Sequence, residues 1–192
     1  MATTWLGVDV GGVRKGFDLA LIDRTGLVEL KGRARVGDVL EAVRRHRPEV
    51  VAIDSPRRTA PHGERSRQDE RSLAKQVCRI RWTPDVASVQ VGASYEWIRE
   101  GLRLYAALER VGVEAVEVFP TASWTRWFDA RGSARRSTWT RAGLAALPLA
   151  HLPDRTNQDQ RDAVAAALTA RQHSEERTER FGEIVVPRAG PP

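Results

Sequence analysis

Residues 6–12 read Leu6-Gly7-Val8-Asp9-Val10-Gly11-Gly12, an apolar run that contains one carboxylate and ends in two glycines. The pattern predicts a strand followed by a turn at Gly11-Gly12. Side chains alternate between the two faces of a strand, so Asp9 shares a face with Trp5 and Gly7. Because an unpaired ionised carboxylate is costly to bury, Asp9 needs a partner. That partner is a metal or a phosphate-bearing ligand or, alternatively, the backbone amides of the glycine turn.

A second carboxylate, Asp54, ends another apolar run, Glu49-Val50-Val51-Ala52-Ile53-Asp54-Ser55-Pro56. A continuous apolar run is typical of a strand buried on both faces in a parallel sheet. Pro56 cannot continue the hydrogen-bond ladder, so the strand ends at Asp54. Ligands of open α/β sheets sit at the carboxyl ends of strands, which favours a functional carboxylate. The alternative is a local turn that Asp54 forms with the Ser-Pro dipeptide.

A third group of acids lies in the alanine-rich segment 157–170, which contains no Gly or Pro and predicts a helix. Asn157 is the expected N-cap. Asp159 and Asp162 are three residues apart and therefore lie on one helix face. The alanines after Asp162 allow the helix to approach a sheet closely. Alternatively, acids in a first turn merely complement the helix dipole.

Acids on a first strand, at the end of a later parallel strand and on a late helix form a set that resembles the ribonuclease H-like superfamily. The helix with two aspartates is most similar to that of the RuvC-type resolvases. A closer resemblance is to the family known as domain of unknown function 429, whose members are predicted to be RNase H-like nucleases. In chain order, the matching pieces are Gly7-Val8-Asp9, Ala52-Ile53-Asp54-Ser55-Pro56, Glu117-Val118-Phe119-Pro120, Asp162-Ala163-Val164-Ala165-Ala166 and Gly182-Glu183-Ile184-Val185-Val186-Pro187.

The resemblance implies an α/β RNase H-like fold, and the pattern of the chain agrees with it. We expect a mixed five-stranded sheet, made of a three-stranded antiparallel meander plus parallel strands, flanked by helices. Besides the strands at Asp9 and Asp54, strands are expected at 17–23, 27–33 and 114–119, a strand or extended tail at 183–187, and helices at 37–46, 68–76, 94–111, 137–147 and 157–172. One domain is expected over 1–188, with a polar arginine-rich insertion at about 55–91 and a frayed tail at 189–192.

Length and composition agree with one compact domain of 192 residues. Cys78 is alone, which excludes a disulfide framework and a cysteine metal site. No apolar run has the length of a membrane span, and residues 1–4 lead into a strand without a signal peptide. The four histidines show no metal-ligand spacing. We therefore expect a cytoplasmic protein with no membrane partner.

The chain is basic, with a net charge of +6 and a pI near 10.3, almost wholly from arginine. Two stretches concentrate this charge: residues 57–81 carry eight basic side chains, and residues 131–141 carry four arginines and no acid. The tryptophans in or beside them are Trp82, Trp124, Trp127 and Trp139. Arginine with tryptophan suits phosphate contact and base stacking, which favours a nucleic acid, DNA or RNA, as partner. The alternative is a solvated basic surface.

Glu117 alternates with apolar residues in Val116-Glu117-Val118-Phe119-Pro120, where the resemblance places a glutamate before a proline-ended strand. Three roles stay open for it: an additional metal ligand, a general base, or an ion-pair partner for an arginine of the 57–81 stretch. Glu70 and Arg71 also lie where the family carries an acidic–basic pattern. A lysine usual in the family is replaced here by Arg135 and Arg136.

The mechanism that these residues favour is metal-assisted hydrolysis of phosphodiesters. Asp9 would bridge two Mg²⁺ or Mn²⁺ ions about 4 Å apart, with Asp54 on one ion and Asp162 on the other. Oxygen ligands suit these ions and disfavour zinc. Asp159 or Glu117 would be a further ligand or support the first ones. The side chains expected to hold substrate phosphates are Lys15, Arg57, Arg71 and Arg79.

Two other functions remain open from the sequence. One is a non-catalytic nucleic-acid-binding or scaffold domain that keeps the fold. The other is an actin-like phosphotransferase, because residues 7–15 also resemble the first phosphate loop of the actin-like sugar kinases. Those kinases bind ATP between two such domains and use a second glycine-rich loop, which this chain lacks.

Overall fold

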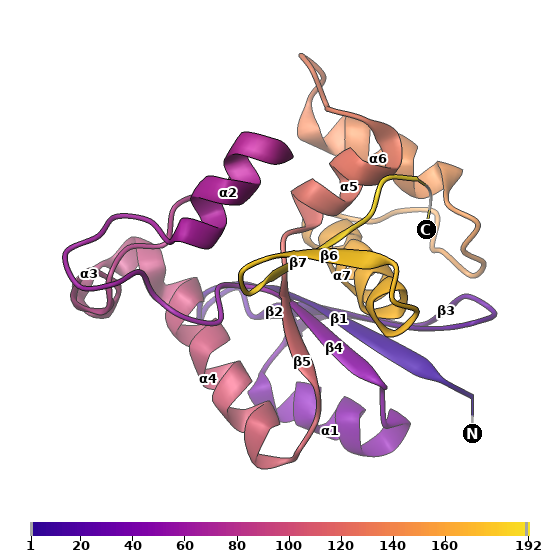
Figure 1. Ribbon diagram of the computed structural model, residues 1–192. Coiled ribbons are helices and arrows are strands. Elements are labelled where there is room, and N and C mark those ends of the chain that lie inside the picture. The colour runs from indigo at the N-terminus through magenta and orange to yellow at the C-terminus, as the bar shows by residue number, and fades with distance from the viewer. Residues whose placement is uncertain (1, 191) are drawn as a thin grey trace.

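The computed structural model describes residues 2–190 and 192 and shows a mixed β-sheet with helices on both faces (Figure 1). The strands are β1 (Thr4–Val10), β2 (Phe17–Asp23), β3 (Leu27–Ala34), β4 (Val50–Asp54), β5 (Ala115–Val118), β6 (Thr178–Phe181) and β7 (Ile184–Pro187). The helices are α1 (Val36–His46), α2 (Gln68–Gln76), α3 (Val86–Val91), α4 (Glu96–Arg110), α5 (Pro120–Phe128), α6 (Arg136–Ala146) and α7 (Gln158–Ser174), with a 3₁₀ turn η1 (Ala93–Tyr95) before α4. The strand order is β3-β2-β1-β4-β5-β7-β6.

Strand β1 lies inside the sheet and determines its mixed character. It pairs antiparallel with β2 and parallel with β4. The register places Asp9 opposite Asp18 of β2 on one side and opposite Asp54 of β4 on the other. Three aspartates therefore stand side by side on adjacent strands.

The alternation expected for β1 is confirmed, because its two sets of side chains belong to two separate cores. Leu6, Val8 and Val10 pack with residues of α1 and α4 on one face of the sheet. On the opposite face, Trp5 packs with the alanines of α7 and with Trp124 of α5. Figure 1 shows α1 and α4 below the sheet and α5, α6 and α7 above it.

Helix α7 crosses β1 at unusually close range, as the alanines after Asp162 predict. A Cβ atom added to Gly7 would lie 2.1 Å from the Ala163 carbonyl oxygen and 2.2 Å from the Ala167 amide nitrogen. Only a glycine on the strand, facing alanines on the helix, permits this approach. Because the indole N–H of Trp5 donates to Ser174 Oγ at 2.8 Å, α7 begins near Asp9 and ends near Trp5.

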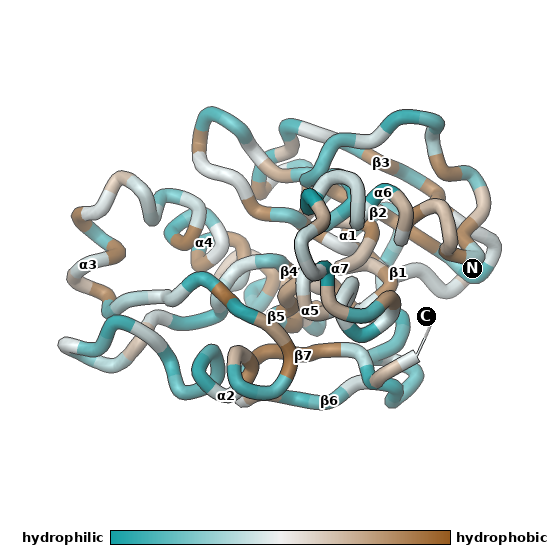
Figure 2. Tube along the Cα trace, turned by 90° about the horizontal axis from the view of Figure 1, so that it is seen from above, coloured by the Kyte–Doolittle hydropathy of each residue, from teal (hydrophilic) through white to brown (hydrophobic). Residues whose placement is uncertain are grey.

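The expected number of five strands is wrong, because the sheet has seven. The strand expected, as an alternative to an extended tail, at 183–187 is β7, which pairs parallel with β5, while the unexpected β6 pairs antiparallel with β7. In β6, Thr-Glu-Arg-Phe, only Phe181 is buried, so the strand has almost no hydrophobic signal. Figure 2 shows this contrast, with β7 coloured as hydrophobic and β6 as mostly hydrophilic.

Two helices were also not expected from the sequence. Helix α5 follows β5 directly and begins with Pro120 at its first turn, a position that proline favours because its missing N–H needs no partner there. Helix α3 is a short helix within the polar insertion, capped by the Asp85 side chain, which accepts from the Ser88 amide at 3.0 Å. Helix α2 coincides with the helix expected at 68–76.

The C-terminal tail is held against the domain for part of its length. The Gly190 amide donates to the Arg126 carbonyl at 3.2 Å, so the chain is hydrogen-bonded to α5 up to this residue of the tail expected to fray at 189–192. Pro191 of that tail and Met1 lie outside the described residues.

Among the described helices, none is long and apolar enough to cross a membrane.

Candidate active site

Asp9 and Asp54 form the centre of the site, at the carboxyl ends of β1 and β4. Their Cα atoms are register partners, and their side chains share a hydrogen bond. Loss of water around Asp54, together with the negative charge of Asp162, raises the pKa of Asp54 to about 7, and Arg136 opposes this shift. Burial and the charge of Asp54 likewise raise the pKa of Asp9 well above its usual value. Without a metal, the pair therefore retains a proton near neutral pH.

Asp162 reaches this pair from α7, which crosses the strands above them. Its carboxylate accepts hydrogen bonds from Gln158 Nε2 at 3.0 and 3.1 Å and from Trp124 Nε1 at 3.3 Å. Arg136 Nη2 of α6 forms an ion pair with it at 3.0 Å. Burial raises the pKa of Asp162, and Arg136 opposes the rise. The charge of Asp162 is thus balanced by an arginine in the metal-free structure.

A second group of carboxylates lies on the β2 side of Asp9. One carboxylate oxygen from each of Asp9, Asp18 and Asp159 lies within 4.8 Å of the other two. Among the described residues, this is the group of three whose spacing fits a single ion. Lys15, from the β1–β2 turn, lies beside it, with its Nζ atom 2.7 Å from Asp159 and 3.9 Å from Asp9.

The sequence interpretation missed Asp18, although the signal was present. A hairpin whose first strand ends at Val10 and whose second begins at Phe17 pairs position 9 with position 18. Asp18 is 5% exposed, and its Oδ1 atom has no hydrogen-bond partner among the described residues. Burial raises its pKa.

The donor set fits Mg²⁺ or Mn²⁺. Around Asp9 the structure gathers carboxylates from β1, β2, β4 and α7, and the group of Asp9, Asp18 and Asp159 contains no histidine or cysteine. Magnesium and manganese prefer oxygen ligands, whereas zinc sites use nitrogen and sulfur. Burial raises the pKa values of Asp9 and Asp54, and a bound cation would stabilise their ionised forms. The ligands proposed from the sequence, Asp9, Asp54, Asp159 and Asp162, all belong to this gathering.

Glu117 forms a buried ion pair, the third of the roles left open for it. Arg67 holds both of its carboxylate oxygens, with Nη1 to Oε2 at 2.8 Å and Nη2 to Oε1 at 2.5 Å. Arg67 Nε also donates to Glu70 Oε1 at 3.0 Å, and Glu70 accepts from the Thr83 amide. Arg67 is 3% exposed. This network joins α2 to β5. It engages the carboxylate of Glu117, which the sequence led us to expect in catalysis.

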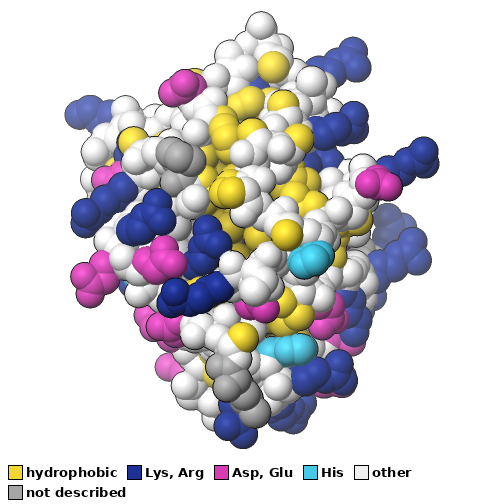
Figure 3. Space-filling model, turned by 90° about the vertical axis from the view of Figure 1, so that its right-hand side faces the viewer, with side chains coloured by type: hydrophobic (Ala, Val, Ile, Leu, Met, Phe, Trp, Pro, Cys, Tyr) yellow, Lys and Arg dark blue, Asp and Glu magenta, His cyan; other side chains and the backbone are white. Residues whose placement is uncertain are grey.

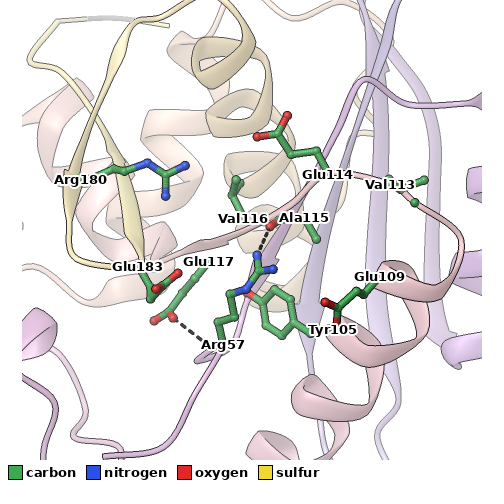
Figure 4. Close-up of a pocket in the computed structure, with 11 residues that line it drawn as sticks. Arg57, Tyr105, Glu109, Val113, Glu114, Ala115, Val116, Glu117, Arg180 and Glu183 are labelled. Atoms are coloured by element: carbon green, nitrogen blue, oxygen red, sulfur yellow. Dashed lines mark hydrogen bonds between the residues drawn. The ribbon is translucent and has the colours of Figure 1, made fainter.

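The arginines expected to hold substrate do not converge on the aspartates. Arg57 donates to the Ala115 carbonyl at 2.5 Å and lies over the Tyr105 ring at 5.4 Å, in a pocket of about 520 Å³ that none of the site aspartates lines (Figure 4). Arg71 is exposed and pairs with Glu64 at 3.1 Å. Arg79 lines a hollow of about 430 Å³ together with Arg136, the partner of Asp162. Of the three, Arg79 alone is thereby linked to the acidic site.

The tryptophans near the basic stretches do not all serve as stacking platforms. Trp124 and Trp127 are buried in the core between α5 and α7, and their rings pack edge to face at 5.5 Å. Trp82 is 44% exposed and remains available for stacking.

Figure 3 shows one face of the molecule, with lysine and arginine side chains along both margins and exposed hydrophobic side chains between them.

The raised pKa of Asp54 predicts how pH acts on the metal-free protein. The folded state holds a proton up to about pH 7, whereas the usual pKa is 3.8, so this contribution to stability is complete below pH 3.8 and is lost as pH rises through 7. In EDTA, we expect the melting temperature to fall by several degrees between pH 5 and pH 8, at about 2–4 °C per kcal/mol. Asp54→Asn should flatten this slope. A melting temperature as pH-dependent in the variant as in the parent protein would contradict the assignment.

The seven-stranded order, the central β1 with Asp9 and the covering helix α7 define an RNase H-like α/β protein. Two structures of RuvC from Thermus thermophilus share this fold. One is 17% identical with a TM-score of 0.51, and the other, in complex with a Holliday junction substrate, is 18% identical with a TM-score of 0.52. Each similarity covers 91% of this chain and 96% of RuvC. At this identity the likeness shows the fold.

Residues 7–185 match the family described as protein of unknown function (DUF429), and the chain belongs to this family. The match begins at Gly7 and ends at Val185 of β7, so it includes β1, α7 and the aspartates that they carry. No curated protein matches the chain.

Proposed function

We propose that the protein is a metal-dependent nuclease that hydrolyses phosphodiester bonds of nucleic acid by a two-metal mechanism. The observation that carries this proposal is the gathering of Asp9, Asp54 and Asp162 at one end of the sheet, from β1, β4 and α7. Burial raises the pKa values of all three, and the charges of Asp54 and Asp162 raise that of Asp9 further, so a divalent cation would stabilise their ionised forms. The RNase H-like fold supports the same function.

In this proposal Asp9 is the ligand that both metal ions share, because β1 lies between β2 and β4. Asp54 and Asp162 lie with it on the β4 side, and Asp159 lies with it on the β2 side. Mg²⁺ or Mn²⁺ bound by these carboxylates would activate the attacking water and neutralise the departing oxygen. Glu117 supports α2 through Arg67 in this proposal and holds no ion.

Arginines from α6 and the hollow beside it would position the substrate. Arg136 balances Asp162 in the metal-free structure, and Arg79 and Arg131 line the same hollow. When a cation takes over the charge of Asp162, the guanidinium of Arg136 becomes free to bind a phosphate. Nucleic acid is the proposed partner on these grounds, and the RuvC structure solved with a Holliday junction supports this choice.

A cleavage screen tests the proposal. Labelled single-stranded and duplex DNA, RNA, a four-way junction and a dinucleotide are each incubated with the full chain in Mg²⁺, Mn²⁺ or EDTA. We expect at least one substrate to be cleaved in Mg²⁺ or Mn²⁺ and none in EDTA. Binding of that substrate should weaken steeply with salt, because arginine–phosphate contacts release counterions.

Two results would contradict the proposal in different ways. Tight, salt-dependent binding without cleavage in either metal would instead indicate a non-catalytic nucleic-acid-binding domain. No binding to any of the nucleic acids at low salt would show that the arginines form a solvated basic surface.

A further inference from the structure

A hollow of about 430 Å³ between the end of α2, α5 and α6 carries positive charge that no carboxylate of its lining balances. Its polar and aromatic lining consists of Arg79, Thr121, Thr125, Arg131, Arg136 and Trp139, and no aspartate or glutamate contributes to it. By contrast, the pocket of about 520 Å³ beside Tyr105 contains four glutamates, and a hollow of about 640 Å³ beside Lys15 contains two aspartates. The hollow between α2, α5 and α6 therefore suits an anionic ligand.

Two of its three guanidinium groups have no partner. The side chains of Arg79 and Arg131 are exposed and make no hydrogen bond, ion pair or ring contact with any described residue. The third guanidinium, that of Arg136, donates to Thr121 Oγ1 at 3.1 Å and forms the 3.0 Å ion pair with Asp162. Because a guanidinium matches the oxygens of a phosphate, Arg79 and Arg131 offer phosphate ligands at a place that Arg136 connects to the candidate metal site.

An indole ring forms part of the wall of the same hollow. Trp139 of α6 is partly buried against the core around α7, and its indole makes no ring contact or hydrogen bond with any described residue. Trp124 and Trp127, by contrast, pack on each other and donate their N–H groups to side chains of α7. A free aromatic face beside unpartnered arginines is the combination that holds a nucleotide, with the base stacked on the ring and the phosphate on the cations.

The size of the hollow favours one nucleotide that has left any duplex. Sites for small ligands have volumes of about 300–1,000 Å³, so the hollow has room for a single nucleotide and not for a double helix. A base inside a duplex is paired and stacked on both faces, and it reaches a ring such as Trp139 only after it has been extruded. A single strand needs no such step. The hollow therefore selects unpaired nucleotides.

We propose that this hollow binds one unpaired nucleotide of a single-stranded substrate, with the base on Trp139 and a phosphate on Arg79 and Arg131. Arg136 then lies between the bound nucleotide and Asp162. This inference rests on the proposed function, because it names the substrate class of the same nuclease. That class is single-stranded nucleic acid, or a strand with an unpaired segment, in preference to continuous duplex.

Fluorescence anisotropy of labelled oligonucleotides with the full chain in EDTA tests the hollow without requiring cleavage. The probes are a single strand, the duplex of the same length and sequence, and that duplex with a single-stranded gap. A surface that only attracts phosphates would bind the duplex at least as tightly, because the duplex has the higher charge density. We expect the single strand and the gapped duplex to bind about tenfold more tightly than the continuous duplex, as stacking of one base allows.

Substitutions of Trp139 test the stacking. Trp139→Leu keeps an apolar side chain and removes the ring, so it should weaken single-strand binding about tenfold and leave duplex binding unchanged. Trp139→Phe keeps a ring and should retain most of the affinity. Trp82→Leu is the matched control, because Trp82 is 44% exposed and does not line the hollow.

Substitutions of the two unpartnered arginines test the phosphate contact. Arg79→Met and Arg131→Met should each weaken single-strand binding and lower the slope of log affinity against log salt by about 0.7, the value for one phosphate contact on a single strand. Arg110→Met is the matched control, because Arg110 is an exposed arginine without a described partner at the end of α4, on the opposite face of the sheet (Figure 1). If Trp139→Leu does not fold, these exposed positions still test the proposal.

The outcomes separate this inference from the proposed function. Equal binding of single strand and duplex, or equal losses in Trp139→Leu and Trp82→Leu, would overturn the inference, and cleavage in Mg²⁺ or Mn²⁺ would then leave the proposed function intact. Single-strand binding that depends on Trp139, without cleavage of any probe in either metal, would support the hollow as a nucleotide site and reject the nuclease. No binding of any probe at low salt would overturn the inference.

Discussion

Asp9→Asn is expected to abolish all Mg²⁺- or Mn²⁺-dependent cleavage while the protein stays folded. The substitution keeps the size of the side chain and removes the one carboxylate that lies next to Asp54 on β4 and within 4.8 Å of Asp18 and Asp159. Because burial and the charge of Asp54 disfavour the ionised form of Asp9, and asparagine carries no charge, we expect stability in EDTA to be unchanged or higher.

Thermal melts of both proteins with and without Mn²⁺ check this expectation. The parent protein should gain stability according to RT ln(1 + [L]/Kd), and Asp9→Asn should lose this gain. Asp154→Asn, in the exposed loop before α7, is the matched control and should behave like the parent. If Asp9→Asn unfolds the protein and the parent shows no Mn²⁺-dependent shift, Asp9 is a structural residue.

Arg67→Met is expected to have the largest effect on stability. It leaves the carboxylates of Glu70 and Glu117 buried without their shared cation. Breaking a buried ion pair by removing one partner typically costs about 3–5 kcal/mol. Arg71→Met, four residues further along in α2, is the matched control, because Arg71 pairs with Glu64 at the surface, where such a pair is worth about 0–1 kcal/mol. Urea unfolding of the two variants compares these costs directly.

Glu117→Gln separates the structural role of Glu117 from a catalytic one. Glutamine keeps one oxygen to accept from Arg67 or from the Arg57 amide, and Arg67 keeps Glu70 as its partner. We therefore expect a smaller loss of stability than in Arg67→Met, and metal-dependent cleavage within about tenfold of the parent. A folded Glu117→Gln protein without cleavage would return Glu117 to the catalytic residues.

The central part of the fold could be predicted from the sequence, because its signals are local. The apolar runs at Asp9 and Asp54 identify two buried strands, and the alanine-rich segment identifies α7. The close crossing at Gly7 follows from small residues on both elements. Strand β6 could not be predicted, because it is held by backbone hydrogen bonds to β7 and buries only Phe181.

The residues of the candidate site could be predicted where their place in a single strand or helix is sufficient. Asp9, Asp54 and Asp162 follow from the ends of their strands and from one helix face. Asp18 requires the hairpin register, which is a property of two strands together. The pairing of Glu117 with Arg67, fifty residues away, depends on where the insertion folds back onto β5, which no local pattern determines.

The most direct test of the proposed metal site is a crystal structure grown with Mn²⁺ and measured at the manganese absorption edge. The account predicts an anomalous peak within coordination distance of Asp9 and Asp54, with Asp162 turned toward the ion and Arg136 released from it. A crystal at saturating Mn²⁺ without a peak near Asp9, and with the Asp162–Arg136 ion pair intact, would contradict it.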